Sequence, residues 1–298
     1  MNDQARGLAS AGVAVRDVRV NGVRLHCTEG GHGTPVVFVH MGGQDFRYWE
    51  EQLAPFALAG YRVLSYSRRY AFPNRNPIAE DYTPRTDAGD LGGLIEEAGL
   101  APAHVVASSI GACAALYLTV DRPELVRTLV LAEPPLLQWA RELPGGEAMF
   151  AAFIERVFRR AGDAFRRDNP EQGMRVLLDY FVAPGAFDAF PPRLRRRVME
   201  NAGDWAAHAT SPDPFPALDR NAVRALRTPV LMLSGADTLP IHKLVDAELE
   251  SLLTRVDRVV VPGATHDVWG DAPDRCRELT LEFLGRRGGP MAMSAAQV

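Results

Sequence analysis

Short apolar runs recur along the chain, and most are followed by a stretch with helical periodicity. Such runs are typical of strands buried on both faces, where every side chain is apolar. The runs are PVVFVH (35–40), YRVLSYS (61–67), AHVVAS (103–108), RTLVLAE (127–133), PVLMLSG (229–235) and DRVVVPG (257–263). The helical stretches lie near 47–59, 85–98, 109–121, 241–254 and 272–285. This alternation predicts an α/β fold with a mostly parallel, doubly wound sheet.

Two segments depart from this alternation. The runs VAVRDVRV and VRLHCTE flank Asn21-Gly22, a turn signal that predicts a β-hairpin. Residues 136–226 carry helical patterns without a strand pattern, which predicts a helical cap inserted between two core strands. We therefore assign 1–135 and 227–286 to the core, 136–226 to the cap and 287–298 to a tail expected to be mobile.

Composition and charge restrict the classes of partner. The 298 residues are 47% hydrophobic and 23% charged, with a net charge of -4, so nothing favours binding to nucleic acid. Three widely spaced cysteines, Cys27, Cys113 and Cys276, form no disulfide framework and no CxxC metal motif. The first ten residues lack an apolar signal core, and no apolar stretch reaches the roughly 18 residues of a membrane span. We expect a cytoplasmic protein that acts on a small molecule away from membranes, with a homodimer as the one assembly considered.

Two adjacent serines follow the strand pattern in HVVASSIGACAALYL (104–118). A nucleophile elbow is a strained strand-to-helix turn that needs small residues two places before and after the nucleophile. Ser109 has Ala107 and Gly111 at these places, whereas Ser108 would have two bulky β-branched residues. The pattern therefore favours Ser109 as a nucleophile. The alternative is a serine that only caps the helix.

A serine nucleophile needs a base and an acid that orients the base. His266 follows the last core strand in VVVPGATHDVW, at the sheet edge where the elbow is expected. His40 ends an earlier strand and is interpreted as a loop-organising residue. For the remaining histidines we expect solvated or core positions: His26, His32, His104, His208 and His242.

Two carboxylates compete for the acid. Asp237 in LSGADTLP and Glu133 in LVLAEPP both follow core strands, and both preserve the chain order of serine, acid and histidine. A glutamate between a buried strand and the diproline at 134–135 is unusual for a solvated charge, and the diproline would hold its backbone in one orientation. The residues alone leave both candidates open.

With these pieces, VVFVHMGG, VVASSIGA, LVLAEPP, VLMLSGADTLP and VPGATHDVW, the chain resembles the α/β-hydrolase superfamily over about residues 13 to 286. It looks most like bacterial members with YSRRY, LAEPP and SPDPFP, and it is more distantly similar to the zearalenone lactonases. The second similarity implies Glu133 as the acid, with Asp237 as the alternative. The superfamily implies an oxyanion hole made by the amide of Ile110 and that of Gly42 or Met41. A serine at the elbow argues against the epoxide hydrolases and haloalkane dehalogenases, which carry aspartate there.

The resemblance implies a serine hydrolase that cleaves an ester or lactone of a mid-sized apolar substrate, without a metal or an organic cofactor. A lyase, a cyclase or a C–C bond hydrolase could use the same three residues, and a non-catalytic binding protein is the third alternative. Aromatic residues of the cap are expected to line the substrate pocket, although simple packing of the cap on the core is the alternative: Trp139, Phe150, Phe153 and Trp205, with Met149 and Phe181. Arg68 and Arg69 could bind an acidic group, but a solvated loop is the simpler interpretation.

Overall fold

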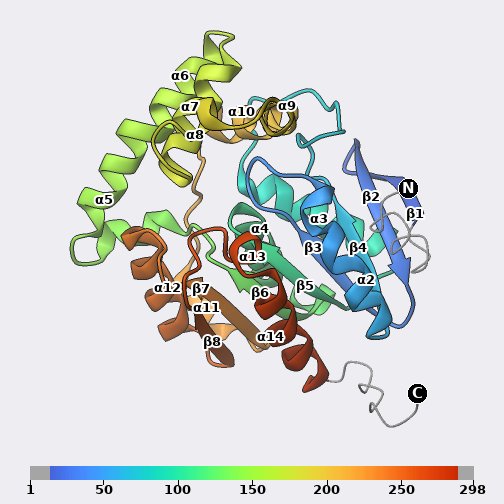
Figure 1. Ribbon diagram of the computed structural model, residues 1–298. Helices are drawn as coiled ribbons and strands as arrows, with labels where there is room; N and C mark the ends of the chain where they lie inside the picture. The colour runs from blue at the N-terminus through green and yellow to red at the C-terminus, as the bar shows by residue number, and fades with distance from the viewer. Residues whose placement is uncertain (1–13, 288–298) are drawn as a thin grey trace.

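An eight-stranded sheet forms the centre of the molecule (Figure 1). The computed structural model describes residues 14–287, so all of the predicted tail except Arg287 lies outside the described residues. The strands are β1 (Ala14–Val20), β2 (Val23–Gly31), β3 (Thr34–Val39), β4 (Tyr61–Tyr66), β5 (Ala103–Ser108), β6 (Val126–Ala132), β7 (Val230–Gly235) and β8 (Val256–Val261). Their order across the sheet is β1-β2-β4-β3-β5-β6-β7-β8. The six predicted core strands correspond to β3 through β8.

The sheet is parallel from β4 to β8, and the antiparallel pairs are β1 with β2 and β2 with β4. The predicted hairpin is present, since Val20 pairs with Val23 across a turn in which Asn21 and Gly22 both have positive φ. These two residue types adopt that conformation at low cost, which fixes the register of the hairpin. The mostly parallel α/β fold predicted from the sequence is confirmed.

Helices cover both faces of the sheet, as the alternation of side chains requires. Val36 packs in a cluster with α2 (Glu50–Leu58) and α14 (Pro273–Gly285), whereas its neighbour Val37 packs with the helices of the opposite face. Those helices are α3 (Pro84–Glu97), α4 (Ile110–Asp121) and α12 (Pro240–Leu252). Adjacent strand residues point to opposite faces, so two covered faces explain why the strands read as continuous apolar runs.

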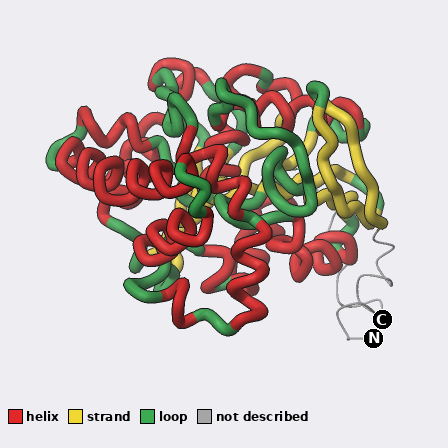
Figure 2. The backbone as a smooth tube through the Cα atoms, turned by 90° about the horizontal axis from the view of Figure 1, so that it is seen from above, coloured by secondary structure: helices red, strands yellow, loops and turns green. Residues whose placement is uncertain are grey.

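The chain between β6 and β7 is helical, and the described residues contain no strand there. We call residues 136–226 the cap. Its helices are α5 (Gly146–Phe153), α6 (Arg159–Arg166), α7 (Pro170–Phe181), α8 (Ala186–Ala189), α9 (Pro192–Glu200), α10 (Ala202–Thr210) and α11 (Arg220–Ala225), with irregular helical turns between some of them. Figure 2, seen from above, shows helices lying over the sheet, with strands visible between them and at one edge. None of the helices within residues 14–287 has both the length and the apolar composition needed to cross a bilayer.

Candidate active site

Ser109, and not Ser108, faces a cavity. Ser109 lies at the turn between β5 and α4 with φ 51° and ψ -120°, a conformation that is rare for a residue with a side chain. The turn is tight, because a Cβ on Gly111 would lie 2.5 Å from the carbonyl oxygen of His40. Ser108 is fully buried at the end of β5. The small flanking residues therefore correctly identified the serine that lines the cavity.

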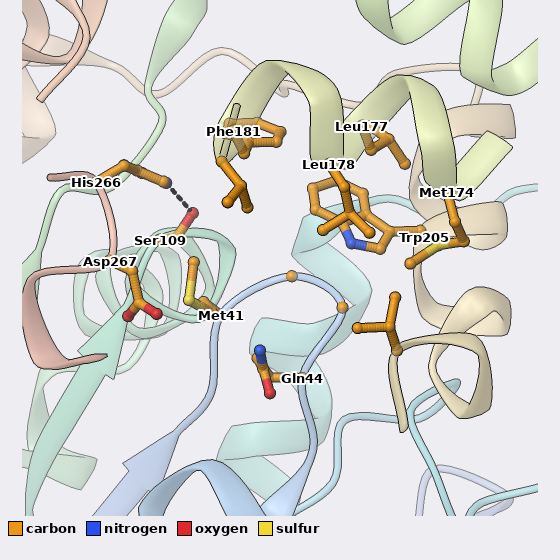
Figure 3. Close-up of a pocket in the computed structure, with 14 residues that line it drawn as sticks. Met41, Gln44, Ser109, Met174, Leu177, Leu178, Phe181, Trp205, His266 and Asp267 are labelled. Carbon is orange, nitrogen blue, oxygen red and sulfur yellow. Dashed lines mark hydrogen bonds between the residues drawn. The ribbon is translucent and has the colours of Figure 1, made fainter. Parts of the chain in front are cut away.

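His266 brings its imidazole to Ser109 from the loop after β8. Its Nε2 lies 2.9 Å from Ser109 Oγ (Figure 3). On the other side of the ring, Nδ1 lies 2.7 Å from Oε2 of Glu133, which is fully buried. An ionised carboxylate only accepts hydrogen bonds, so the network assigns the ring proton to Nδ1 and leaves Nε2 to accept from the serine hydroxyl. The three side chains thus form one continuous hydrogen-bonded chain.

Glu133 is held in one orientation at the end of β6. Its backbone has φ 48°, and its Oε1 accepts the N–H of Gly235 at 2.7 Å. Oε2 accepts the hydroxyl of Thr238 at 2.6 Å in addition to the histidine. Both of these donors belong to the turn between β7 and α12. This turn therefore stabilises the carboxylate of Glu133 by hydrogen bonds.

Asp237 lies in the same turn, but its side chain is exposed. Its backbone N–H donates to the carbonyl oxygen of Ala264 at 2.9 Å. Within residues 14–287 no hydrogen bond or ion pair involves its carboxylate. The neighbour of His266 is therefore Glu133, and the role of a loop-ordering group expected for Asp237 has no side-chain contact to support it.

His242 is a residue of the site that sequence reasoning missed. It was expected to be solvated or to belong to the general core, yet its ring stacks on that of His266 with centroids 4.1 Å apart. Burial lowers the pKa of His242 well below its usual value, and the neighbouring His266 adds to this shift. His242 lies in the first turn of α12, soon after Thr238, which bonds to Glu133. This closeness in sequence could have identified it as a residue of the site.

Three potential metal ligands converge here. One ligand atom each of Glu133, His242 and His266 lies within 4.8 Å of the others. The oxygens of Glu133, however, already accept three hydrogen bonds, and the two rings lie face to face, with 29° between their planes. Ligands of one ion point their lone pairs at a common centre. The geometry fits a hydrogen-bonded chain with a stacked neighbour.

The loop after β3 carries the amides expected to form an oxyanion hole. Met41, Gly42 and Ile110 all line the cavity around Ser109. Ile110 is the first residue of α4, so its N–H has no partner within the helix. Within residues 14–287 no hydrogen bond is recorded for the amides of Met41 or Gly42. These amides are available to an oxygen atom bound beside Ser109.

His40 organises this loop, as predicted. It is fully buried, and its Nδ1 lies 2.7 Å from the carbonyl oxygen of Met41, while its Nε2 accepts the N–H of Arg68 at 2.9 Å. Burial lowers the pKa of His40 to about 3, so the ring is neutral and can donate on one side and accept on the other. The ring therefore connects the loop to the end of β4.

A buried ion-pair cluster fixes the far end of the loop to the cap. The carboxylate of Asp204, on α10, accepts the N–H of Gly43 at 2.9 Å and the guanidinium of Arg68 at 2.7 Å. Arg68 also pairs with Asp87 at 2.7 Å, and all three side chains are almost fully buried. Two carboxylates thus share one cation, and burial raises the pKa of Asp204 to about 6, an effect that Arg68 only partly opposes.

The expectation of a solvated loop at Arg68 and Arg69 is wrong. The side chain of Arg68 is 2% exposed and that of Arg69 is 11% exposed, with Arg69 paired to Asp90. The partners of Arg68 lie 19 and 136 residues away in the sequence, so local sequence could not show that its charge is neutralised. Both arginines are paired with buried carboxylates, so neither is a free cation for an acidic substrate.

Two connected spaces meet at Ser109, and we call them the outer chamber and the inner chamber. The outer chamber encloses about 670 Å³, part of it open to solvent, and the inner chamber about 260 Å³. Ser109, Phe181, Trp205 and His266 line both. Figure 3 shows the wall that the cap adds to the outer chamber, an apolar set made mostly of α7 side chains: Met174, Leu177, Leu178, Phe181 and Trp205.

Three of the five aromatic residues predicted to contact substrate line a chamber. Trp205 lines both and Phe153 lines the inner one. Trp139 and Phe150 line neither, which corrects the prediction: Trp139 Nε1 donates to the carbonyl oxygen of Leu218 at 2.8 Å, and the ring of Phe150 lies under the guanidinium of Arg141.

Trp139 lies just before α5 and Phe150 lies within it, on the side of the cap near α12. The sequence showed their aromatic character but not the direction in which this short helix turns them. The aliphatic residues of α7 and the rings of Phe158, His208 and Phe215 were missed for the same reason. Of the other two predicted residues, Phe181 lines both chambers, whereas Met149 is 39% exposed.

Comparison with known proteins places this geometry in a family. The family model described as alpha/beta hydrolase fold matches residues 34–273. The chain is 28% identical to a putative non-heme bromoperoxidase, BpoC, of Mycobacterium tuberculosis, over 88% of this chain and 98% of that protein. It is 25% identical to a 2-hydroxy-6-oxo-6-phenylhexa-2,4-dienoate hydrolase of Delftia acidovorans, over 95% of this chain and 99% of that protein.

A solved structure of epoxide hydrolase CorEH superposes with a TM-score of 0.73 at 18% identity, covering 92% of this chain and 99% of that one. At this identity the likeness concerns the fold alone. The family model, by contrast, spans the sheet from β3 onward, the elbow, the cap and the loop that carries His266. The chain therefore belongs to the alpha/beta hydrolase fold family.

Proposed function

We propose that the protein is a serine hydrolase that cleaves an ester or a lactone. The observation that carries this proposal is the buried hydrogen-bonded chain from Ser109 Oγ through His266 to Glu133, with distances of 2.9 and 2.7 Å. A nucleophile, a base within hydrogen-bond reach and a third group that orients the base are the requirements for activating a hydroxyl. The cavity on the serine side gives a carbonyl group access to this arrangement.

In the first half of the reaction Ser109 Oγ bonds to the carbonyl carbon, and its proton passes to Nε2 of His266. Glu133 keeps the imidazole in the required tautomer and stabilises its charged form. The carbonyl oxygen becomes an oxyanion, for which the amides of Ile110 and of Gly42 or Met41 are the donors. His266 then gives its proton to the departing alcohol oxygen, and an acyl group remains on the serine.

In the second half a water molecule takes the place of the alcohol. His266 accepts one water proton as the oxygen attacks the acyl carbon, and it returns this proton to Ser109 Oγ when the acyl–serine bond breaks. The carboxylic acid leaves and the serine is restored. In a lactone the alcohol stays attached to the acid, so one hydroxy acid is the product.

An apolar, mid-sized substrate fits the two chambers best. The cap wall of the outer chamber is aliphatic and aromatic, as the walls of small-molecule sites usually are. Neither chamber is lined by arginine or lysine within the described residues. Strongly anionic substrates therefore lack a counterion beside Ser109.

A C–C bond hydrolase is the second candidate, because one relative of full length is named for that reaction. The substrate in that name is a carboxylate. Arg68, which is connected to the loop after β3 through Asp204, is committed to Asp87 and Asp204. Turnover of 2-hydroxy-6-oxo-6-phenylhexa-2,4-dienoate without turnover of esters would favour this second candidate.

Labelling by a fluorophosphonate tests the nucleophile. Wild type and Ser108→Ala should be labelled on one serine, whereas Ser109→Ala should lose both the label and the hydrolysis of 4-nitrophenyl esters and macrolactones. Ser108 is the matched control, since it is the adjacent residue of the same type and lines neither chamber. Undiminished labelling of Ser109→Ala would overturn the assignment, and a wild type that is neither labelled nor active would favour a binding protein.

A further inference from the structure

The inner chamber contains two imidazoles that the proposed reaction does not use. His208 comes from α10 and His242 from the first turn of α12, and both are almost fully buried. Both line the space between Ser109 and the aromatic residues of the cap. The two histidines are the polar groups that this chamber adds to Ser109 and His266.

His208 has no hydrogen-bond partner on either nitrogen in the described structure. Its neighbours are rings: the centroids of Phe158 and Phe215 lie 5.0 and 5.3 Å away, and that of Trp205 lies 6.0 Å away. Leaving a buried polar group without a partner is unfavourable, and native proteins seldom do so without a functional reason. An imidazole enclosed by aromatic rings beside a nucleophile is therefore placed to meet a polar group of a ligand.

The charge state of these rings restricts the ligand. Burial lowers the pKa of His208 to about 3, and the nearby Arg68 acts in the same direction. A neutral imidazole offers one N–H donor and one acceptor nitrogen. On His242 the Nδ1 atom likewise has no partner in the described structure. The chamber thus presents neutral donors and acceptors, which suit a group that both donates and accepts.

The size of the chamber restricts the ligand further. Most of its empty space of about 260 Å³ is too narrow for an atom, and what remains holds about one water-sized group. It can therefore take one small polar group of a substrate whose bulk lies in the outer chamber. A hydroxyl group is small, uncharged, and both a donor and an acceptor.

We propose that the inner chamber selects esters or lactones carrying a hydroxyl group near the scissile bond, and that His208 is the residue that recognises this hydroxyl. This inference rests on the proposed function, because it places the hydroxyl relative to an acyl group on Ser109. His208 acts as a specificity-determining residue, with His242 as a second polar group on the core side of the same space.

Two matched pairs of esters test the proposal, because either side of the scissile bond could enter the inner chamber. The first pair is 4-nitrophenyl 3-hydroxybutanoate and 4-nitrophenyl 3-methylbutanoate. The second is 3-hydroxyphenyl acetate and 3-methylphenyl acetate. Within each pair a hydroxyl replaces a methyl group of similar size. In at least one pair wild type should prefer the hydroxyl member in kcat/KM by a factor of about 2 to 10, the range expected for one neutral hydrogen bond.

Variants of His208 connect this preference to the residue. His208→Phe should abolish or invert the preference, and His208→Gln, which keeps a donor and an acceptor, should retain part of it. His208→Phe should also leave the thermal midpoint unchanged or raise it, because it removes a buried polar group that has no partner. A residue that merely maintained the fold would instead lower the midpoint on substitution.

Several results would overturn the inference. These are the absence of a hydroxyl preference in both pairs, a hydroxyl preference that survives in His208→Phe, or a marked loss of stability in that variant. Absence of all ester turnover together with absence of serine labelling would be a different failure. It would overturn the proposed function, and this inference with it.

Discussion

At the scale of single residues, the position of the acid distinguishes this site. Glu133 combines a backbone φ of 48° with three hydrogen bonds to its carboxylate, one of them to His266. Asp237, the competitor by sequence, is exposed in the turn that supplies two of those donors. The segment that contains Asp237 therefore donates two hydrogen bonds to the carboxylate of Glu133, which follows the neighbouring strand β6.

Glu133→Gln should lower kcat by about ten-thousandfold, the loss typical of an orienting acid removed with the geometry intact. The amide presents an N–H₂ where the carboxylate accepts, so the imidazole is driven into the wrong tautomer. Steady-state kinetics on a 4-nitrophenyl ester provides the measurement. Asp237→Asn is the matched control and should change kcat less than about threefold, since that side chain is solvated. The opposite order of severity would return the acid to Asp237.

At the scale of secondary structure elements, α10 is the cap helix that contacts the loop after β3, at Gly42 and Gly43. Asp204 holds the N–H of Gly43, and the ring of Trp205 packs so closely on Gly42 that a Cβ there would lie 2.9 Å from it. Asn201, just before the helix, donates to Asp45 and accepts from the N–H of Phe72. The cap therefore shapes the loop after β3, which carries the proposed oxyanion donors, as well as covering it.

Asp204→Ala should lower kcat more than it raises KM, because the loop loses the acceptor that fixes Gly43. Deleting an oxyanion donor costs roughly a hundredfold to a thousandfold, so loosening the loop should cost less, on the order of tenfold. Asp204→Asn keeps an acceptor oxygen and should recover most of the activity. Asp188→Ala, which removes an exposed partner of Arg175 elsewhere in the cap, should have no effect. An effect of Asp204→Ala on KM alone would contradict a positioning role.

Hydrogen exchange should divide the cap into two parts. The helix α10 is buried and bonded to the core, whereas α9 has no buried residue. Amides of α9 should therefore exchange much faster than those of α10, because few contacts oppose its local opening. A cap that opened as one unit would instead give one common rate. Mass spectrometry of peptides covering 192–200 and 202–210 separates these two outcomes.

At the scale of the whole molecule, the strands were predictable because each is covered on both faces and leaves a continuous apolar run. That Ser109 and not Ser108 faces the cavity was predictable from sterics, since only Ser109 has small flanking residues. Arg68 was not, because its partners come from α3 and α10 and local sequence says nothing of them. The lining positions of His208 and of the α7 residues were not predicted for a related reason. A position in a cap helix can face the core, the substrate or another helix, and the sequence does not say which.

Arg68→Met tests how much the buried cluster matters to the whole fold. It removes the one cation that Asp87 and Asp204 share and leaves two buried carboxylates without compensation. Removing one partner of a buried pair typically costs about 3–5 kcal/mol, so the free energy of unfolding should fall by this amount in urea titrations. Arg69→Met, which breaks the pair with Asp90, is the matched neighbour. An equal or smaller loss at Arg68 would mean that the cluster is not a principal link between cap and core.

The position of Glu133 has a consequence for building chimaeras from this protein. The residue proposed to orient the base is also the last one before the diproline that leads out of the sheet and into the cap. A cap from another protein grafted at residue 133 would bring its own torsion angles to that carboxylate. A junction placed after Pro135 would keep Glu133, its left-handed backbone and its donors from the β7–α12 turn together in one parental piece. Chimaeras joined after Pro135 are thus expected to stay active and to take on the substrate range of the donor of the cap. Chimaeras joined at residue 133 are expected to lose activity.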